Sequence, residues 1–128
     1  MNLMMELADR LGLSYLYITH DLAVARCTSQ ELAMMYMGKI VEYGETEELL
    51  AKPLHPYTQA LISAVPIPDP SHHRSAPAIK GGISKPIDPL PCCRFLERCP
   101  RADKVCTGND QPPLQNKGGR HRVACWLI

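Results

Sequence analysis

The 128-residue sequence contains no run of about 18 apolar residues, the length that a membrane-spanning helix needs. Residues 1–20 also lack a basic segment followed by an apolar one, so no signal peptide is visible. These absences argue against a membrane-spanning chain and against a secreted one, and therefore against a fold held by disulfides. The length suits one ordinary domain, and the net charge is +1.

The stretch from Cys92 to Trp126 has few large apolar side chains and is interrupted by prolines and glycines. It can bury little surface, so the conformational entropy lost on ordering it should exceed its hydrophobic gain. Five of the six cysteines lie in these 35 positions. Four thiolates around a metal centre would supply the missing stabilisation.

Without Cys92, the spacing of these cysteines is five, six and eighteen residues, which leaves no Cys-x2-Cys pair. Structural zinc sites usually bring their ligands in such tight pairs, whereas iron–sulfur clusters accept thiolates from wide, uneven loops. The residues alone leave both iron–sulfur and zinc open, ahead of disulfides or free thiols. Because adjacent side chains rarely reach one metal, either Cys92 or Cys93 is not a ligand.

Charge is distributed unevenly along the chain. Residues 1–91 carry 7 basic and 10 acidic side chains, and residues 92–128 carry 7 basic and 3 acidic ones, net +4. The basic end could meet a phosphate-rich partner, or it could offset the negative charge of four thiolates and a cluster. We favour the second interpretation and expect no nucleic-acid partner.

The first part of the chain predicts a helix, a strand and a second short helix. Residues 2–11 place leucine at every fourth position, which predicts an amphipathic helix. Residues 13–18 are aromatic and branched and predict a strand, so a helix followed at once by a strand indicates an α/β layer. Asp21 can cap a short helix over residues 22–26. His20 lies where such sheets commonly face a ligand, although a hydrogen-bonded structural histidine is the alternative.

A hairpin and a helix are predicted next. Residues 32–37 and 40–43 predict two strands joined by a two-residue turn at 38–39. The helix is expected over residues 46–52, with Thr46 as its N-cap and two glutamates in its first turn.

One more helix is expected, with Pro56 at its first position and a buried stripe formed by Leu61, Ile62 and Val65. His55 is interpreted as packing the joint between this helix and its neighbour rather than contacting a ligand. The chain from Pro66 onward then becomes rich in proline.

Residues 66–91 contain seven of the twelve prolines and predict an extended linker, with an optional short strand around residues 78–80. His72 and His73 suggest a metal site, but a proline-bounded pair of this kind is more often solvated. We therefore expect the linker to connect two parts of the chain without a site of its own.

Four motifs, in their order and spacing, resemble the C-terminal part of the ATP-binding subunit of oligopeptide and dipeptide ABC importers. They are Tyr17-Ile18-Thr19-His20-Asp21-Leu22, Met35-Tyr36-Met37-Gly38-Lys39-Ile40-Val41-Glu42, Pro53-Leu54-His55-Pro56-Tyr57-Thr58, and the tail from Cys93-Arg94-Phe95 through Arg98-Cys99-Pro100 to His121-Arg122-Val123-Ala124-Cys125. Each motif alone is a weak signal, and the set is specific because it covers nearly the whole chain.

The resemblance implies three parts. Residues 1–52 match the C-terminal piece of an α/β P-loop ATPase core, built from helix, strand, short helix, β-hairpin and helices. Residues 53–91 match the helix and proline-rich linker of the family's C-terminal region, and residues 92–128 match a small, irregular, cysteine-rich domain. His20 matches the switch histidine that contacts the ATP γ-phosphate in the family.

For the cysteines, the resemblance favours a [4Fe-4S] cluster over zinc, because some family members bind such a cluster here. The ligands that it implies are Cys93, Cys99, Cys106 and Cys125. Cys92 is then a bystander, since the family usually has a small residue at that position. Cys27, in the short second helix, is likewise expected not to be a ligand.

The resemblance also implies a setting for the intact family protein. It couples binding and hydrolysis of ATP, with Mg²⁺, to peptide uptake, together with membrane permease subunits and a second ATPase subunit. It works in the cytoplasm, peripheral on the inner face of the cell membrane.

This chain departs from the family because it lacks a G-x-x-x-x-G-K-[ST] phosphate loop, the signature motif and the acidic strand end before a catalytic glutamate. We therefore predict that it is inactive as an ATPase alone, whether it is an expressed domain, a truncated frame or half of a split gene. Two alternatives are a free-standing iron–sulfur or zinc-binding module and a regulatory domain that docks on a full-length ATPase.

Overall fold

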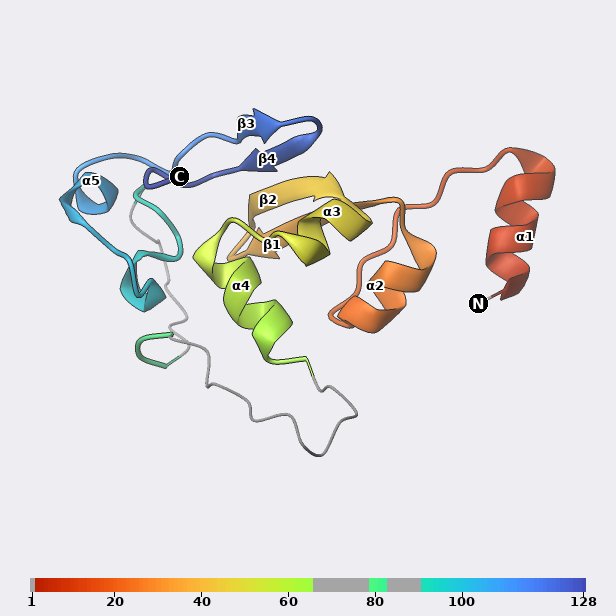
Figure 1. Ribbon diagram of the computed structural model, residues 1–128, viewed down its shortest axis with the longest axis horizontal. Helices are drawn as coiled ribbons and strands as arrows, with labels where there is room; N and C mark the ends of the chain where they lie inside the picture. Colours follow the sequence, from red (N-terminus) through yellow and green to blue (C-terminus); the bar gives the residue numbers. More distant parts are fainter. Residues whose placement is uncertain (1, 66–78, 83–90) are drawn as a thin grey trace.

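The computed structural model describes residues 2–65, 79–82 and 91–128 (Figure 1). In chain order its elements are α1 Asn2–Leu11, α2 Leu22–Thr28, β1 Glu31–Tyr36, β2 Lys39–Glu45, α3 Thr46–Ala51, α4 Pro56–Ser63, the 3-10 turn η1 Leu96–Arg98, α5 Lys104–Thr107, β3 Gln115–Gly118 and β4 His121–Val123. The strands form one antiparallel sheet in the order β1-β2-β4-β3. The mixed α/β class predicted from the sequence is confirmed, although its sheet is small and antiparallel.

The β1–β2 hairpin was predicted correctly, with its turn displaced by one residue. Tyr36 pairs with Lys39, so the turn residues are Met37 and Gly38, at φ angles of 46° and 75°. A tight two-residue turn of this kind needs positive φ at both positions, which glycine adopts without strain. The predicted turn at 38–39 is therefore wrong by one position.

The strand predicted at residues 13–18 does not form. No strand in the described part of the chain pairs with this segment, and the side chains of Leu16 and Ile18 are 92% and 96% exposed. β-rich composition yields a strand only where a neighbour supplies the ladder and a surface to pack on. The helix predicted over 2–11 is confirmed as α1, which stands apart from the sheet at one end of the molecule (Figure 1).

The N-cap predicted for α2 is confirmed, whereas the N-cap predicted for α3 is wrong. Asp21 caps α2 as predicted, because its carboxylate accepts hydrogen bonds from the backbone N–H groups of Ala23 and Val24 at 2.8 and 3.2 Å. The prediction that Thr46 caps α3 is wrong: Thr46 is already helical, and its hydroxyl donates to the Ser29 carbonyl oxygen at 2.6 Å. That bond ties α3 to the end of α2.

Helix α4 begins at Pro56 as predicted, and His55 is its N-cap. The predicted buried stripe is wrong, because Leu61, Ile62 and Val65 are only half-buried. The buried residues of this helix are Pro56, Thr58 and Ala60. The helix packs through its first turns, where the rings of His55 and Tyr57 meet Phe95 from the cysteine-rich tail.

The hydrophobic core is shared between the N-terminal elements and the tail. Its buried cluster comprises Ala25, Leu32, Met34, Tyr36, Val41, Leu49, Phe95 and Cys99. Phe95 is 1% exposed, and Val123 of β4 is fully buried. Part of the tail is therefore ordered by packing against the β1–β2 hairpin and α4, a source of stability that its composition did not suggest.

The linker predicted over 66–91 lies mostly outside the described residues, as do His72 and His73. Of the short strand suggested at 78–80, only residues 79–80 are described, and they are not in a strand. The Lys80 N–H donates to the Arg98 carbonyl oxygen at 3.1 Å. Among the described helices, none combines the length and apolarity needed to cross a bilayer.

Candidate functional site

Four thiols from four different parts of the tail lie within electrostatic reach of one another. Cys93 precedes η1, Cys99 follows it directly, Cys106 lies in α5, and Cys125 comes two residues after β4. The Cys93 thiol is influenced by the other three, and the Cys125 thiol by Cys99 and Cys106. The fold thus brings together the four cysteines that the resemblance implied, although their role as ligands stays a prediction.

Burial sets the protonation state of three of these thiols. It is the largest cause of a raised pKa at Cys93, Cys99 and Cys125, and the neighbouring thiols raise each pKa further. Desolvation disfavours the charged form of an acid, so without a metal these groups are neutral thiols at neutral pH. Binding of a metal would have to displace their protons.

Backbone N–H donors lower the pKa of the same thiols and so act against burial. The N–H groups of Phe95, Arg101 and Leu127 each donate to the sulfur of the cysteine two residues earlier, which lowers the pKa of that thiol. Hydrogen bonds of this kind favour the thiolate and tune metal–sulfur centres. The loops around these sulfurs are therefore shaped to stabilise negative charge on them.

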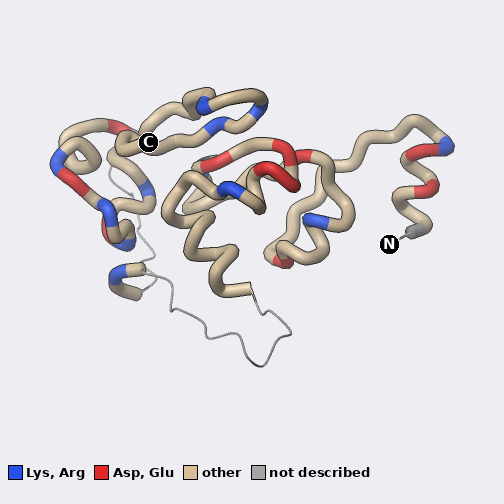
Figure 2. The backbone as a smooth tube through the Cα atoms, in the orientation of Figure 1, with Lys and Arg blue, Asp and Glu red and all other residues tan. Residues whose placement is uncertain are grey.

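Positive charge also gathers in this region. Figure 2 shows Lys and Arg along the cysteine-rich tail, whereas Asp and Glu are frequent on α1, β2 and α3. Arg101 lowers the pKa of the thiols of Cys99 and Cys125, and Lys80 lowers that of Cys99. Nearby positive charge thus favours the thiolate form of Cys99 and Cys125. That the basic tail offsets the charge of a bound cluster stays a prediction.

The donor chemistry fits a metal–sulfur group, but the arrangement does not surround a single ion. Thiolates are soft ligands that suit zinc and iron–sulfur clusters. A tetrahedral zinc ion needs all four sulfurs at about 2.3 Å from one point, whereas each thiolate of a [4Fe-4S] cluster binds a different iron. Within the described residues, no group of three or more His, Cys, Asp or Glu side chains is positioned to hold one metal ion.

The other two cysteines are the ones predicted not to be ligands. Cys92, beside Cys93, is half-buried. Cys27 is exposed on α2, next to Arg26. All six cysteines are described, and none forms a disulfide.

Phe95 fixes the loop that carries the first two cysteines of the group. Its ring lies edge-on to Tyr36, with centroids 5.2 Å apart, and 5.6 Å from the rings of both His55 and Tyr57. His55 is 1% exposed, so the packing role predicted for it is confirmed. The segment between Cys93 and Cys99 is thereby held against β1 and α4.

A buried polar network fixes the other end of the tail, and sequence reasoning missed it. The Glu42 carboxylate is fully buried and meets His121 Nε2 at 2.7 Å. It also accepts hydrogen bonds from the backbone N–H groups of Leu54 at 2.7 Å and His55 at 3.1 Å. The sequence signal that could have revealed this network was the carboxylate of Glu42 among the apolar residues of a predicted strand. A carboxylate is rarely buried without partners, so its position there indicates that hydrogen-bonding groups lie around it.

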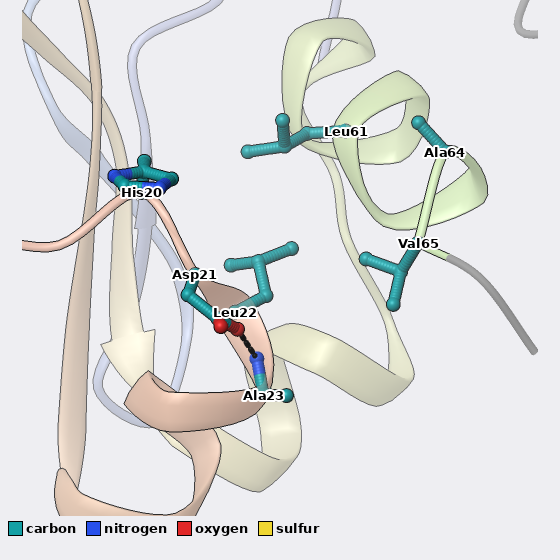
Figure 3. A pocket seen from close by; sticks show the side chains of 7 residues that line it. All are labelled: His20, Asp21, Leu22, Ala23, Leu61, Ala64 and Val65. Carbon is teal, nitrogen blue, oxygen red and sulfur yellow. Dashed lines mark hydrogen bonds between the residues drawn. The ribbon is translucent and has the colours of Figure 1, made fainter.

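His20 lies at a separate site. It helps to line a cavity of about 340 Å³ between the start of α2 and the end of α4 (Figure 3). The lining residues are His20, Asp21, Leu22, Ala23, Leu61, Ala64 and Val65. None belongs to the cysteine-rich tail, and none is a Lys or Arg that would bind phosphate oxygens. The exposed His20 is thus accessible but not surrounded by a nucleotide site.

The family model described as oligopeptide/dipeptide transporter, C-terminal region, matches residues 41–106. Over 128 residues the chain is 41% identical to the dipeptide transport ATP-binding protein DppF of Haemophilus influenzae, covering all of this chain and 39% of that protein. It is 42% identical over 128 residues to DppF of Escherichia coli, covering 38% of it. It is 41% identical over 125 residues to the probable peptide ABC transporter ATP-binding protein y4tS of Sinorhizobium fredii, covering 98% of this chain and 35% of that protein.

The chain therefore spans less than two fifths of the length of these curated relatives. The family match, in contrast, extends over more than half of the chain, from β2 to α5. It includes Glu42 and three of the four clustered cysteines. This chain belongs to the family of oligopeptide/dipeptide transporter C-terminal regions.

Proposed function

We propose that this chain serves as the C-terminal part of the ATP-binding subunit of an ABC importer for dipeptides or oligopeptides. In this role it completes an ATPase core and does not hydrolyse ATP alone. Its relatives bear the names of dipeptide and peptide transport ATP-binding proteins, and it corresponds to a little over a third of their length. The finer description of the fold, as the end of a P-loop ATPase core followed by a cysteine-rich domain, is part of this proposal.

The observation that carries the proposal is an apolar segment at residues 3–18 without a described partner. Its exposed large apolar side chains are Leu3, Met4, Met5, Leu11, Leu13, Tyr15, Leu16 and Ile18. Large exposed apolar side chains concentrated in one segment suggest an interaction site. Residues 13–18 also have the composition of a strand, so pairing with the edge of a larger sheet would satisfy both their backbone and their side chains.

Docking of residues 13–18 as a strand would bring His20, which lies two residues beyond, to the edge of that sheet. Ligands in open α/β sheets bind beyond the carboxyl ends of the strands, and His20 would there contact the ATP γ-phosphate. The phosphate loop and the groups that seat Mg²⁺ would come from the rest of the ATPase. The partners in this proposal are membrane permease subunits and a second ATPase subunit, at the cytoplasmic face of the cell membrane.

We also propose that Cys93, Cys99, Cys106 and Cys125 hold a [4Fe-4S] cluster, with zinc as the alternative. The proposal is supported by the mutual proximity of the thiols, their backbone N–H donors and the positive charge of Arg101. A bound cluster would cross-link four segments of the tail. The chain's own residues would hold the sulfurs in place and stabilise their charge.

A chimaera tests the transporter role. The C-terminal part of E. coli DppF that this chain matches is replaced by the chain, and Mg²⁺-dependent ATP hydrolysis is measured. The chimaera should hydrolyse ATP, and His20→Ala should abolish hydrolysis, whereas Cys27→Ser should leave it intact. A folded chimaera that hydrolyses no ATP, beside an active parent, would overturn the proposal.

Absorption spectroscopy of anaerobically purified chain tests the cluster. A broad absorption band at about 400 nm is expected for a cysteine-ligated [4Fe-4S] centre. A colourless protein that contains zinc would reverse the order of the two metals. A colourless protein without metal, after reconstitution with iron and sulfide, would overturn metal binding altogether.

A further inference from the structure

We infer that Glu42 and His121 form a positioning pair that holds Cys125 against the other three clustered thiols. This inference rests on the proposed metal binding at the four cysteines. It assigns a role to a buried network that neither the transporter role nor the ligand set requires.

Cys125 owes its place to β4. This strand has only three residues, and it pairs with β2 through Glu42 opposite Val123 and Tyr43 opposite Arg122. Just beyond β4, the Ala124 N–H donates to the Val41 carbonyl oxygen at 2.8 Å. So short a ladder provides few hydrogen bonds, and the position of Cys125 then depends on whatever else holds β4 on β2.

The Glu42–His121 contact is that additional attachment. Both side chains are buried, at 0% and 5% exposure, and their nearest atoms are 2.7 Å apart. The Glu42 carboxylate is itself fixed by the backbone N–H groups of Leu54 and His55. On its other side, the His121 ring has Nδ1 3.9 Å from a Glu48 carboxylate oxygen. Glu42 thus provides a rigid acceptor to which β4 is attached.

The four cysteines do not depend on this attachment equally. Cys99 and the loop after Cys93 are anchored separately, because Phe95 is buried among Tyr36, Tyr57 and His55. Removing one partner of a buried hydrogen-bonded pair leaves the other unsatisfied, which costs more than an ordinary contact. Loss of the pair should therefore release Cys125 and leave Cys93 and Cys99 in place.

Site-resolved alkylation tests this asymmetry. The full chain is reconstituted anaerobically with ferrous iron and sulfide, and in a parallel arm with zinc alone. It is then exposed to iodoacetamide, and mass spectrometry follows each cysteine. In the wild type the four clustered thiols should be protected in at least one arm. In His121→Ala the alkylation rate of Cys125 should rise about tenfold or more, and that of Cys93 and Cys99 less than about twofold.

Two variants serve as controls. Arg122→Ala changes the neighbouring, exposed residue of β4 and should behave as the wild type. His121→Gln keeps a side-chain donor for the Glu42 carboxylate and should restore most of the protection. Because this second substitution is conservative, it distinguishes loss of the pair from a failure of the chain to fold.

The outcomes separate the metal proposal from the positioning role. If the wild type binds neither metal and protects no thiol, the metal proposal fails and the positioning role fails with it. If the wild type protects all four thiols and His121→Ala does so equally, only the positioning role is overturned. Equal exposure of all four thiols in His121→Ala would likewise overturn it, because the pair would then be a general stabiliser of the tail.

Discussion

Tyr36 and Phe95 meet edge to face, with ring centroids 5.2 Å apart and an angle of 88° between their planes. Tyr36 ends β1, and Phe95 lies two residues after the first clustered cysteine. Aromatic pairs favour this geometry because the positive edge of one ring faces the negative face of the other. The contact joins the proposed metal site to the hairpin, so the stability of the two should be linked.

Replacement of Phe95 tests that link. Phe95→Ala removes a side chain that is 1% exposed and leaves a cavity between β1, α4 and the tail. The expected loss in the free energy of unfolding is about 3–5 kcal/mol, measured by urea denaturation of the metal-free chain. Leu16→Ala, at a side chain that is 92% exposed, should change it by less than about 0.5 kcal/mol. Equal effects of the two substitutions would show that Phe95 anchors nothing.

Several local features were predicted well, because they depend on residues close in sequence. The hairpin turn needs a glycine at positive φ, and Asp21 caps the helix that follows it directly. Helix α1 follows from the spacing of its own leucines. In each case the residues that decide the structure lie within a few positions of one another.

Features that depend on distant residues were missed. Glu42 and His121 are 79 positions apart, and nothing near either residue indicates the other. The strand expected at 13–18 fails for a related reason, since a ladder needs a partner that the described residues do not supply. The gathering of Cys93 with Cys125 is likewise a property of the fold, which places β4 beside β2. The spacing left Cys92 and Cys93 as alternatives and the family resemblance suggested the set, whereas the fold brings the four thiols within electrostatic reach of one another.

The stability of the chain should depend on the protonation of His55. Burial lowers the pKa of His55 to about 4, and its Nδ1 accepts the Tyr57 N–H at 3.1 Å, so the ring is neutral in the folded state. In the unfolded chain a histidine titrates near pH 6.5. The folded pKa is the lower one, so the contribution of His55 is complete above about pH 6.5 and is lost as the pH falls towards 4. The expected loss from this group is about 3 kcal/mol.

The measurement is the free energy of unfolding in urea at several values between pH 7 and 4. His55→Asn is the matched variant, because asparagine can still cap α4 but does not titrate. The variant should be less stable at pH 7 and should show a weaker dependence on pH in this interval. A dependence as steep as that of the wild type would assign the effect to another group.

The chain alone should release no phosphate from ATP. Phosphoryl transfer depends on positioning the phosphates and stabilising their charge, and the sequence has no phosphate loop to do so. A phosphate-release assay with Mg²⁺ and the purified chain should stay at background. Release above background that His20→Ala abolishes would contradict this expectation and would place a complete site within the chain.

Serine substitutions should separate the clustered cysteines from the other two. Cys93→Ser, Cys99→Ser, Cys106→Ser and Cys125→Ser are each expected to lose the cluster, because each thiol lies within electrostatic reach of others in the group. Cys27→Ser and Cys92→Ser are expected to retain it. Iron and labile sulfide per chain, measured after anaerobic reconstitution, give the result directly.

The pair Cys92 and Cys93 makes this series decisive. The two are adjacent, so a general disturbance of the loop should affect both variants alike. The Cys93 thiol interacts with the other clustered thiols and accepts the Phe95 N–H, and the side chain of Phe95 is anchored in the core. Loss in Cys93→Ser with full retention in Cys92→Ser would therefore identify the ligand. The reverse result would mean that Cys92 is the ligand and that the assignment is wrong by one residue.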